Sequence, residues 1–377
     1  MSDSLQSPVR LLIISGVCDN PELFLFRGLA RSGFAVDLIC DYKEQRRAEL
    51  SEAGIDVEER HIRHRFDFSS ARWVRERIRA RSYDVVYALF NKGLAAAVLA
   101  SRGLPVKVVG YRGTMGNLSY LDPGCYVAHL HRRVRCIICN CDAVKRYLLD
   151  FGFAPERVVR IYKGHEVGWY QGNESAARSE VGIPEDAFVV GCCANVRPLK
   201  GIDVLIRAAA RAADVPLHLL IVGQTPDQRC QKLAKRLGLE GRVHFTGFRH
   251  DAVRLMRTCN AAVMPSLRRE GVPRAIVESM SQGMPVIVSD VGGMPELVKH
   301  GESGLVVPPG DDAALAGAMT SLYRQPELAL RLGRSAPGWI SERFSTGAYL
   351  AEHRALFERL AAENRADSAQ VSTSPAP

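Results

Sequence analysis

The stretch PSLRREGVPRAIVESMSQGMPVIVSDVGGMPE, residues 265–296, has the most regular order of apolar runs and turn residues in the chain. An apolar run ends just before it, and a polar loop then leads to Pro273. Proline suits the first position of a helix, where its missing N–H has no cost, and Gly283 suits the position just past the helix end. The apolar run PVIVSD and the turn GGMPE follow. The stretch therefore predicts loop, helix, strand, loop and helix, which is one repeat of a parallel α/β sheet.

Two carboxylates belong to this stretch, Glu270 before the helix and Glu278 within it. Counted along one helix at about 1.5 Å per residue, they are separated by roughly 12 Å. A glycosidase acid/base pair needs about 5–10 Å, so the spacing does not predict that chemistry. It suits two carboxylates that hold opposite ends of a long ligand with phosphates between them, because the helix N-terminus at 271–274 attracts anions. Two unrelated glutamates on a solvated helix are the alternative.

The same stretch resembles the E-x7-E signature of retaining family 4 glycosyltransferases of the GT-B fold. PS precedes the first glutamate, EGVP contains it, and GMPVIVSDVGGMPE follows the second. With GESGLVVPPGD at 301–311, the similarity covers more than forty residues. The resemblance implies two Rossmann-like α/β domains that face each other across a cleft. It also implies an enzyme that moves a sugar, with retention of configuration, from a nucleotide diphospho-sugar to an acceptor hydroxyl.

Length and composition agree with a two-domain globular protein. The chain has 377 residues, of which 47% are hydrophobic and 24% charged. No apolar run reaches 18 residues and the first residues are polar, so we expect neither a membrane span nor a secretory signal. We therefore predict a cytoplasmic protein.

The ten cysteines are typical of reduced thiols in the cytosol, because they occur singly in apolar strands as often as in loops. RCIICNC at 135–141 groups three of them. Alternation along a strand separates Cys136 from the other two, and no second cluster completes a metal site. We predict that these cysteines are core thiols and that the protein needs no metal. We also predict no cofactor, because the nucleotide diphospho-sugar would be a substrate.

The alternation of strands and helices predicts the domain limits. Residues 1–165 open with the strand RLLIISG and form a Rossmann-like acceptor-side domain, although the full G-x-G-x-x-G fingerprint is absent. Residues 166–345 restart the pattern, and the resemblance implies that they form the nucleotide-sugar-binding domain. By the resemblance, a helix over 346–363 packs back on the first domain. Residues 364–377 are small and polar, so we expect them to be disordered.

Two cations follow the first strand of the second domain, in CANVRPLKGID at 193–203. Arg197 and Lys200 can neutralise a diphosphate leaving group, whose charge grows in the transition state. The segment resembles the family's G-R-L-x-x-x-K-G clamp, with Lys200 at its lysine. The family arginine falls on Asn195, so either Arg197 takes over or the clamp depends mainly on Lys200. A surface ion pair without a function is the alternative.

The resemblance assigns Glu270 to the hydroxyls of the transferred sugar, assisted by the backbone N–H groups of Gly271 and Val272. It assigns Glu278 to the ribose hydroxyls of the nucleotide. The predicted catalytic group consists of Glu270, Lys200 and Arg197.

Further donor contacts are implied by loops that end strands. Gly16 resembles the family glycine whose backbone approaches the diphosphate, although the usual tandem glycines are missing. Gly223 resembles a glycine near the nucleotide. The loop TGFRHD at 246–251 resembles the loop whose backbone reads the nucleobase, which makes Phe248 and Arg249 candidates for that pocket.

The first domain departs most from the family pattern. Many relatives place a histidine near the reacting sugar where this chain reads VVGYRGTMGN, so Arg112 is a candidate contact for the donor phosphate or an anionic acceptor. A structural arginine is the alternative. His165 is interpreted as a hinge-turn residue rather than a base. No convincing nucleophile or base emerges, which suits the family mechanism in which the leaving phosphate takes the acceptor proton.

Residues 60–81 carry eight arginines and two histidines but two acids, in a chain of formal net charge +9. The sequence predicts a basic helix over much of this range. Either its arginines form a solvated face, or they contact anionic lipid headgroups or an acidic acceptor. No nucleic-acid-binding motif is present. We predict a peripheral contact with the cytoplasmic membrane face and a glycan or lipid-linked acceptor, in cell-surface polysaccharide or glycolipid biosynthesis.

Two other classes of protein stay open. A GT-B-fold nucleotide-sugar epimerase would share the two domains and the nucleotide pocket, but such enzymes do not usually carry the E-x7-E block. A non-catalytic sugar-binding relative conflicts with the intact Glu270, Glu278 and Lys200.

Overall fold

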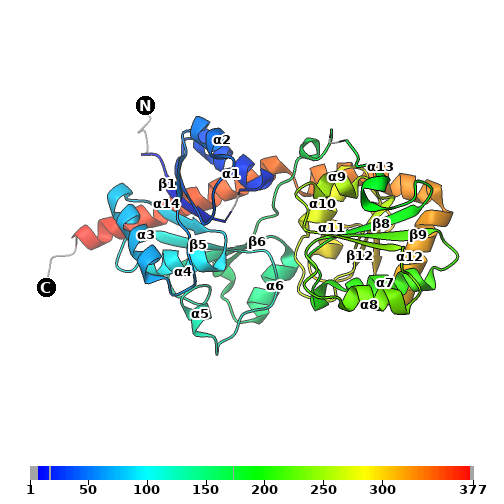
Figure 1. The fold of residues 1–377 in the computed structure, drawn as a ribbon. Coiled ribbons are helices and arrows are strands. Elements are labelled where there is room, and N and C mark those ends of the chain that lie inside the picture. Colours follow the sequence, from blue (N-terminus) through cyan, green and yellow to red (C-terminus); the bar gives the residue numbers. More distant parts are fainter. Residues whose placement is uncertain (1–6, 17, 173, 374–377) are drawn as a thin grey trace. The chain divides into compact units, whose positions relative to one another are not determined.

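The structure is a computed structural model that describes residues 7–16, 18–172 and 174–373. It divides into two compact units, of which the C-terminal unit is His165–Ser345 and the N-terminal unit is the rest of the described chain (Figure 1). Each unit is a parallel sheet with helices packed against it. The predicted pair of Rossmann-like α/β domains is confirmed.

The N-terminal unit contains a seven-stranded parallel sheet in the order β3-β2-β1-β4-β5-β6-β7. Its strands are β1 (Arg10–Ser15), β2 (Ala35–Cys40), β3 (Asp56–Glu59), β4 (Val85–Ala88), β5 (Lys107–Arg112), β6 (Val134–Cys139) and β7 (Val158–Arg160). The central strands are buried and apolar because helices cover both faces of a parallel sheet. The strand order reverses between β1 and β4. Open α/β sheets bind ligands beyond the carboxyl ends of their strands at such points.

The helices of this unit include one that the chain adds after the second unit. They are α1 (Asn20–Arg31), α2 (Arg47–Glu52), α3 (Phe68–Arg81), α4 (Asn91–Ala100), α5 (Pro123–Tyr126), α6 (Asp142–Asp150) and α14 (Thr346–Thr373). Helix α3 packs against α4, whereas α14 packs against α1, β4 and β5. Phe26, Tyr87 and Phe357 are fully buried in the apolar core that joins α1, the sheet and α14.

Helix α14 is longer than the sequence predicts. Residues 364–373, expected to be disordered, continue the helix. Asn364 donates a hydrogen bond to the carbonyl of Pro105 at 2.9 Å, and Arg365 binds the carboxylate of Asp84 at 2.8 Å. The polar composition of the segment concealed these partners, so the prediction was wrong there. Residues 374–377 lie outside the described residues.

The C-terminal unit contains a six-stranded parallel sheet in the order β10-β9-β8-β11-β12-β13. Its strands are β8 (Phe188–Cys193), β9 (Leu217–Val222), β10 (Val243–Gly247), β11 (Ala261–Met264), β12 (Val286–Ser289) and β13 (Leu305–Val307). Its helices are α7 (Ile202–Arg211), α8 (Arg229–Arg236), α9 (Ala252–Met256), α10 (Arg274–Ser281), α11 (Met294–Leu297), α12 (Asp312–Arg324) and α13 (Pro326–Arg343). The stretch 265–296 contains the loop, α10, β12, the turn and α11 in the predicted order.

Three further findings concern thiols, metal ions and membranes. All ten cysteines are free and nine are buried, and burial raises the pKa of Cys136 and of Cys139 to about 12. The described residues contain no group of three or more His, Cys, Asp or Glu side chains suited to a metal ion. Within the same residues, no helix has both the length and the apolar character needed to cross a bilayer.

Candidate active site

Lys200 and Glu270 meet at the carboxyl ends of the neighbouring strands β8 and β11. Lys200 Nζ lies 2.7 Å from Glu270 Oε2, and the hydroxyl of Ser266 donates to the same oxygen at 2.8 Å. The Glu270 residue is 8% exposed. The structure therefore joins two of the predicted catalytic residues in a partly buried ion pair, a contact that the spacing in the sequence did not reveal.

Close packing of two loops positions this ion pair. Gly201 has a φ of +65°, and a Cβ atom there would lie 2.0 Å from the carbonyl oxygen of Pro265. Two residues away from each of these positions, Leu267 N donates to Leu199 O at 2.8 Å. The loop that carries Lys200 is thus held against the loop that carries Glu270, and a glycine is required where they touch.

Glu270 lies outside helix α10, because the helix begins at Arg274 with Pro273 as its N-cap. The separation of about 12 Å, which assumed a helix through both glutamates, does not apply. Glu278 Oε1 lies 3.1 Å from Arg274 Nε one turn earlier. Gly283 follows the helix with a φ of +75°, as predicted. Gly271 and Val272 lie in the loop between Glu270 and the N-cap.

The side chain of Arg197 takes no part in this ion pair. Its side chain is exposed and lines a cavity of about 350 Å³ next to α7 and α8, together with Asp227 and Arg229. Neither Lys200 nor Glu270 lines that cavity. The geometry favours the alternative in which the clamp depends mainly on Lys200.

The family's arginine position and the predicted nucleotide glycine have structural roles in this chain. Asn195 Oδ1 accepts a hydrogen bond from Gln224 N at 3.0 Å and so joins the loops after β8 and β9. Gly223 has a φ of +148°, and a Cβ atom there would lie 2.3 Å from the carbonyl oxygen of Ala194. Backbone packing explains this glycine, and its contact with a nucleotide stays a prediction.

The predicted nucleobase loop follows β10. The ring of Phe248 is 60% exposed and lies edge-on to His250, with 4.9 Å between the ring centroids. Arg249 forms two 2.8 Å hydrogen bonds with Asp251, which lower the pKa of that carboxyl to about 2. Phe248 is available to stack on a base, whereas Arg249 already has a carboxylate partner.

In the N-terminal unit, carboxylates surround the backbone that follows Gly16. Glu44 accepts a hydrogen bond from Cys18 N at 3.0 Å, and Asp19 caps α1. Lys163 Nζ lies 2.7 Å from Asp19. Val17 lies outside the described residues. This loop offers acidic surroundings to a diphosphate, so the assignment of Gly16 to that role stays an untested prediction with little support in the geometry.

The remaining candidates of the first domain are buried. Arg112 ends β5 and is 6% exposed, and burial lowers the pKa of its guanidinium. His165 is 4% exposed, and its Nδ1 lies 2.9 Å from the hydroxyl of Tyr170. That contact agrees with a structural turn residue at the start of the C-terminal unit. Two buried polar residues near Arg112, His129 and Asn140, had no sequence motif to reveal them.

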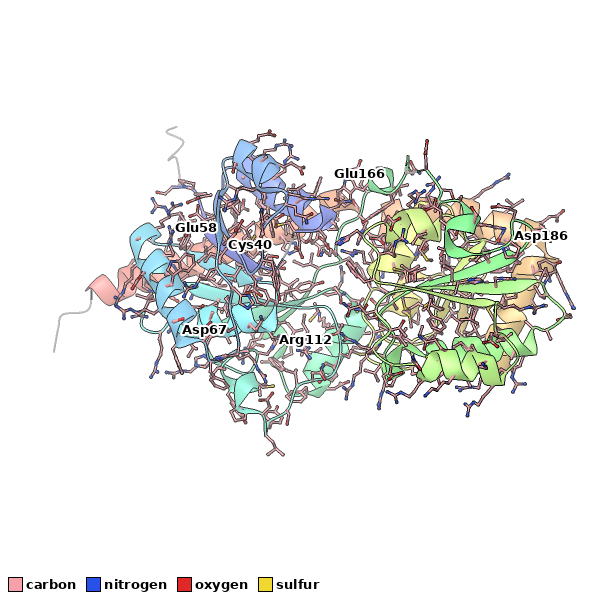
Figure 2. All side chains as sticks on the ribbon, viewed as in Figure 1. Cys40, Glu58, Asp67, Arg112, Glu166 and Asp186 are labelled. Atoms are coloured by element: carbon pink, nitrogen blue, oxygen red, sulfur yellow. The ribbon has the colours of Figure 1, made fainter. Side chains whose placement is uncertain are left out.

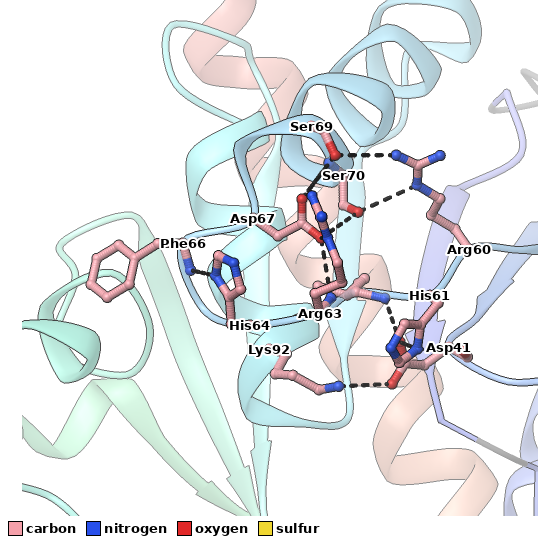
Figure 3. Close-up of polar contacts among 11 residues, drawn as sticks. Asp41, Arg60, His61, Arg63, His64, Phe66, Asp67, Ser69, Ser70 and Lys92 are labelled. Carbon is pink, nitrogen blue, oxygen red and sulfur yellow. Dashed lines mark hydrogen bonds and ion pairs between the residues drawn. The ribbon is translucent and has the colours of Figure 1, made fainter.

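Much of the basic charge at 60–81 has partners within the protein. Figure 3 shows Arg60 and Arg63 around Asp67, the N-cap of α3. Although burial opposes it, hydrogen bonds from Arg63, Ser69 and Ser70 lower the pKa of Asp67.

Within α3 itself, Arg75 donates to the carbonyl of Ala100 at 2.8 Å, and Arg81 binds Asp37 and Asp56 at 2.7 Å each. Partners distant in sequence thus bind both arginines, which the sequence did not reveal. The contact of residues 60–81 with a membrane surface stays a prediction.

Comparisons with known proteins agree with this geometry. A family model described as glycosyl transferases group 1 matches residues 173–339, and one described as glycosyltransferase family 4 matches residues 23–168. The lipopolysaccharide core biosynthesis glycosyltransferase LpsE of Rhizobium meliloti strain 1021 is 32% identical over 58% of this chain and 64% of its own. D-inositol 3-phosphate glycosyltransferase 1 of Catenulispora acidiphila is 30% identical over 67% of each chain. The chain spans about half to two thirds of the length of these curated relatives.

Solved structures share the fold at low identity. Anabaena HepE in complex with UDP has a TM-score of 0.76 at 24% identity and covers 93% of this chain and 100% of its own. A glycosyltransferase from Rickettsia africae ESF-5 has a TM-score of 0.79 at 17% identity, covering 94% of this chain and 99% of its own.

Proposed function

Because the chain belongs to the GT-B glycosyltransferases of the group 1, family 4 type, we propose that it moves a sugar, with retention of configuration, from a nucleotide diphospho-sugar to an acceptor hydroxyl. The observation that carries the proposal is the 2.7 Å contact between Lys200 and Glu270 at the carboxyl ends of β8 and β11. Ligands of parallel α/β sheets bind at that edge.

The ion pair suggests how the donor binds. A diphosphate competes with the Glu270 carboxylate for Lys200, and the carboxylate that is released accepts hydrogen bonds from hydroxyls of the sugar. The N-terminus of α10 adds a positive dipole, and its N-cap Pro273 provides no side-chain hydrogen bond there. Glu278 on the same helix binds the ribose hydroxyls.

The bond between the anomeric carbon and the phosphate oxygen then breaks, and charge develops on the departing diphosphate. Lys200 stabilises this charge more strongly than that of the bound donor, which lowers the barrier. The acceptor oxygen attacks on the face from which the diphosphate leaves, and a phosphate oxygen takes its proton. This scheme uses no metal ion. Transfer that is abolished by EDTA in the purified protein would contradict it.

Nucleotide diphospho-sugars are the proposed donors, and UDP is the first nucleotide to test. Anabaena HepE, which shares the fold, has been crystallised with UDP and with UDP-glucose. The glycosyltransferase LpsE, named for lipopolysaccharide core biosynthesis, supports a cell-surface glycan or glycolipid as the class of acceptor.

We also propose a peripheral contact between residues 60–81 and an anionic membrane surface. Arg72 pairs weakly with Glu76 on the exposed side of α3, and Phe68 at the start of this helix is 68% exposed. Exposed aromatic and basic side chains together favour the headgroup region of a bilayer. Arg72→Glu with Arg79→Glu should reduce sedimentation with vesicles that contain phosphatidylglycerol. Binding equal to that of the wild type would refute this contact.

The transfer itself is tested by product analysis. Purified protein, a nucleotide sugar and candidate lipid or glycan acceptors should give a glycoside whose anomeric configuration matches the donor in its NMR spectrum. An inverted product would contradict retention. Release of the nucleotide with an epimerised free sugar and no glycoside would favour an epimerase instead.

A further inference from the structure

Three buried polar side chains gather at the carboxyl ends of the adjacent strands β5 and β6 in the N-terminal unit. Arg112 is the last residue of β5 and is labelled in Figure 2. Asn140 directly follows β6, and its N–H donates to the carbonyl of Arg112 at 3.3 Å. His129 lies in the segment between the two strands. The three residues are 6%, 5% and 3% exposed in the order named.

The positive charge of Arg112 has no counter-charge in the described part of the chain. Its guanidinium donates to the carbonyl of Gly116 and lies against Tyr147, with 5.8 Å between Cζ and the ring centroid. No ion pair of Arg112 with a described carboxylate exists, and burial lowers the pKa of the guanidinium. A buried charge that is removed from water without a partner of opposite charge is strongly destabilising.

Polar atoms of all three residues also lack a partner. Arg112 Nε, His129 Nε2 and Asn140 Oδ1 are buried, and none has a hydrogen-bond partner among the described residues. Burial, followed by the nearby charge of Arg112, lowers the pKa of His129 to about 3. Native proteins rarely bury such atoms unpaired, so three in one cluster call for an explanation. The amide of Asn140 can turn to present its NH₂ group instead of its oxygen.

The loop that follows β5 adds further donors. In the described structure, the backbone N–H groups of residues 113–116 donate to no protein acceptor. Gly116 and Asn117 have φ values of +81° and +58°, so the chain turns back over the guanidinium at this point. Gly113 leaves space beside the hydroxyl of Tyr111. A Cβ atom on residue 113 would lie 3.2 Å from that hydroxyl oxygen.

We propose that this cluster is an anion-binding site, in which Arg112 and the backbone of residues 113–116 bind a phosphate or carboxylate group. The anion replaces the carbonyl of Gly116 as the partner of the guanidinium and supplies the missing negative charge. The planar guanidinium binds two oxygens of such a group at once. The NH₂ group of Asn140 donates to a remaining oxygen.

This inference rests on the proposed function, because the anion would belong to a substrate of the same transfer. Two substrates can supply it. It is either an anionic group of the acceptor or the diphosphate of the donor. Their shared chemistry is a group of anionic oxygens, and competition between ligands separates the two sources.

The test uses the full-length protein and inorganic phosphate as the probe. Phosphate is titrated at constant ionic strength, with and without saturating UDP, and binding is followed by calorimetry and by the thermal shift. Arg112→Gln should weaken phosphate binding by about tenfold to a hundredfold, the loss expected for a charge-assisted hydrogen bond. Without phosphate, its Tm should equal or exceed that of the wild type, because an unbalanced charge is removed.

Arg133→Gln is the matched control. Arg133 is a partly buried arginine of the same unit that already donates to Ser101 Oγ at 3.1 Å and to the carbonyl of Leu104 at 2.7 Å. Its variant should have a lower Tm and an unchanged affinity for phosphate. If Arg112→Gln does not fold, Asn140→Asp decides, since a carboxylate at that position should neutralise Arg112 and exclude phosphate.

Each outcome has a defined meaning. Phosphate that binds equally with UDP present identifies the acceptor anion, whereas competition with UDP and a weaker UDP affinity of Arg112→Gln identify the donor diphosphate. Equal phosphate affinity in the wild type and the variant that folds would overturn the proposal, as would a wild type that binds UDP but no phosphate. A wild type that binds no nucleotide diphosphate would instead count against the proposed function.

Discussion

The ion pair between Lys200 and Glu270 gives the most specific prediction for stability and turnover together. Lys200→Met removes the cation and leaves the Glu270 carboxylate with the hydroxyl of Ser266 as its one described side-chain partner. The Lys200 side chain is 26% exposed and that of Glu270 is 11% exposed, so water replaces the lost contact in part. A hydrogen bond to a charged group contributes about 1.5–3 kcal/mol, and we expect a loss of about 2 kcal/mol in the free energy of unfolding.

Turnover should decrease much more than stability. Removing one preorganised group that stabilises developing charge typically lowers kcat by about 10²–10³-fold, or roughly 3–4 kcal/mol. Turnover is measured as the rate of sugar transfer to an acceptor. Without an acceptor, it is measured as the slow hydrolysis of the nucleotide sugar. Urea unfolding gives the stability of the same samples.

The double variant Lys200→Met/Glu270→Gln shows whether the two side chains act as a pair. Because neither charge is then left alone, its stability loss should be smaller than the sum of the single losses by about 1 kcal/mol. Lys299 and Glu302 are the matched control, since their ion pair has the same 2.7 Å length but is solvent-exposed. Its coupling should not exceed about 0.5 kcal/mol. Additive losses at Lys200 and Glu270, or a kcat of Lys200→Met within about threefold of the wild type, would refute the reasoning.

Three further changes test contacts within each of the two units. Gly201→Ala should lower the free energy of unfolding by more than about 2 kcal/mol, because its Cβ would meet the carbonyl of Pro265 at 2.0 Å; urea unfolding measures this, and a neutral effect would contradict the close packing of the loops. Asp67→Asn should cost about 1–3 kcal/mol at pH 7. The pKa of Asp67 is lower in the folded than in the unfolded protein. The difference in free energy of unfolding between the wild type and Asp67→Asn should therefore shrink as the pH falls below about 4. A difference that does not depend on pH would exclude a role for the charge of Asp67. Arg365→Ala should lower Tm by a few degrees and loosen the end of α14 in hydrogen exchange, because the contacts with Asp84 are lost; unchanged protection would show that the helix end is held without them.

The α/β repeats were predictable from the sequence because their signals are local. Strand β12 and Gly283 lie where the order of apolar runs and turn residues placed them. The fold class followed from many such local signals and from the resemblance. Pro273 was expected at the first helical position and is the N-cap of α10 instead, one position earlier. Such local signals therefore place an element boundary to within about one residue here.

The features that could not be predicted depend on contacts between distant residues. Lys200 and Glu270 are seventy positions apart, and their contact depends on the packing of two loops at Gly201. Arg81 belongs to the basic stretch 60–81, but its partners Asp37 and Asp56 lie on the strands β2 and β3. Composition shows that a charge exists, but not whether a partner reaches it from another strand.

The sequence identified one member of the buried cluster around Arg112 but not the other two. The arginine was a candidate because it stands where relatives place a histidine. His129 and Asn140 carry no motif, and their unpaired atoms become visible once β5 and β6 are neighbours.

Binding of nucleotide diphosphates is the measurement that bears most directly on the proposed glycosyl transfer. Thermal unfolding is recorded for the wild type, Lys200→Met and Lys299→Met with UDP, GDP, ADP and CMP, and with their sugar conjugates. A ligand that binds the folded state raises Tm by mass action. We predict a selective increase with one nucleotide diphosphate, lost in Lys200→Met and kept in Lys299→Met. No increase with any of them, or one that Lys200→Met retains in full, would contradict a donor site built on Lys200 and Glu270.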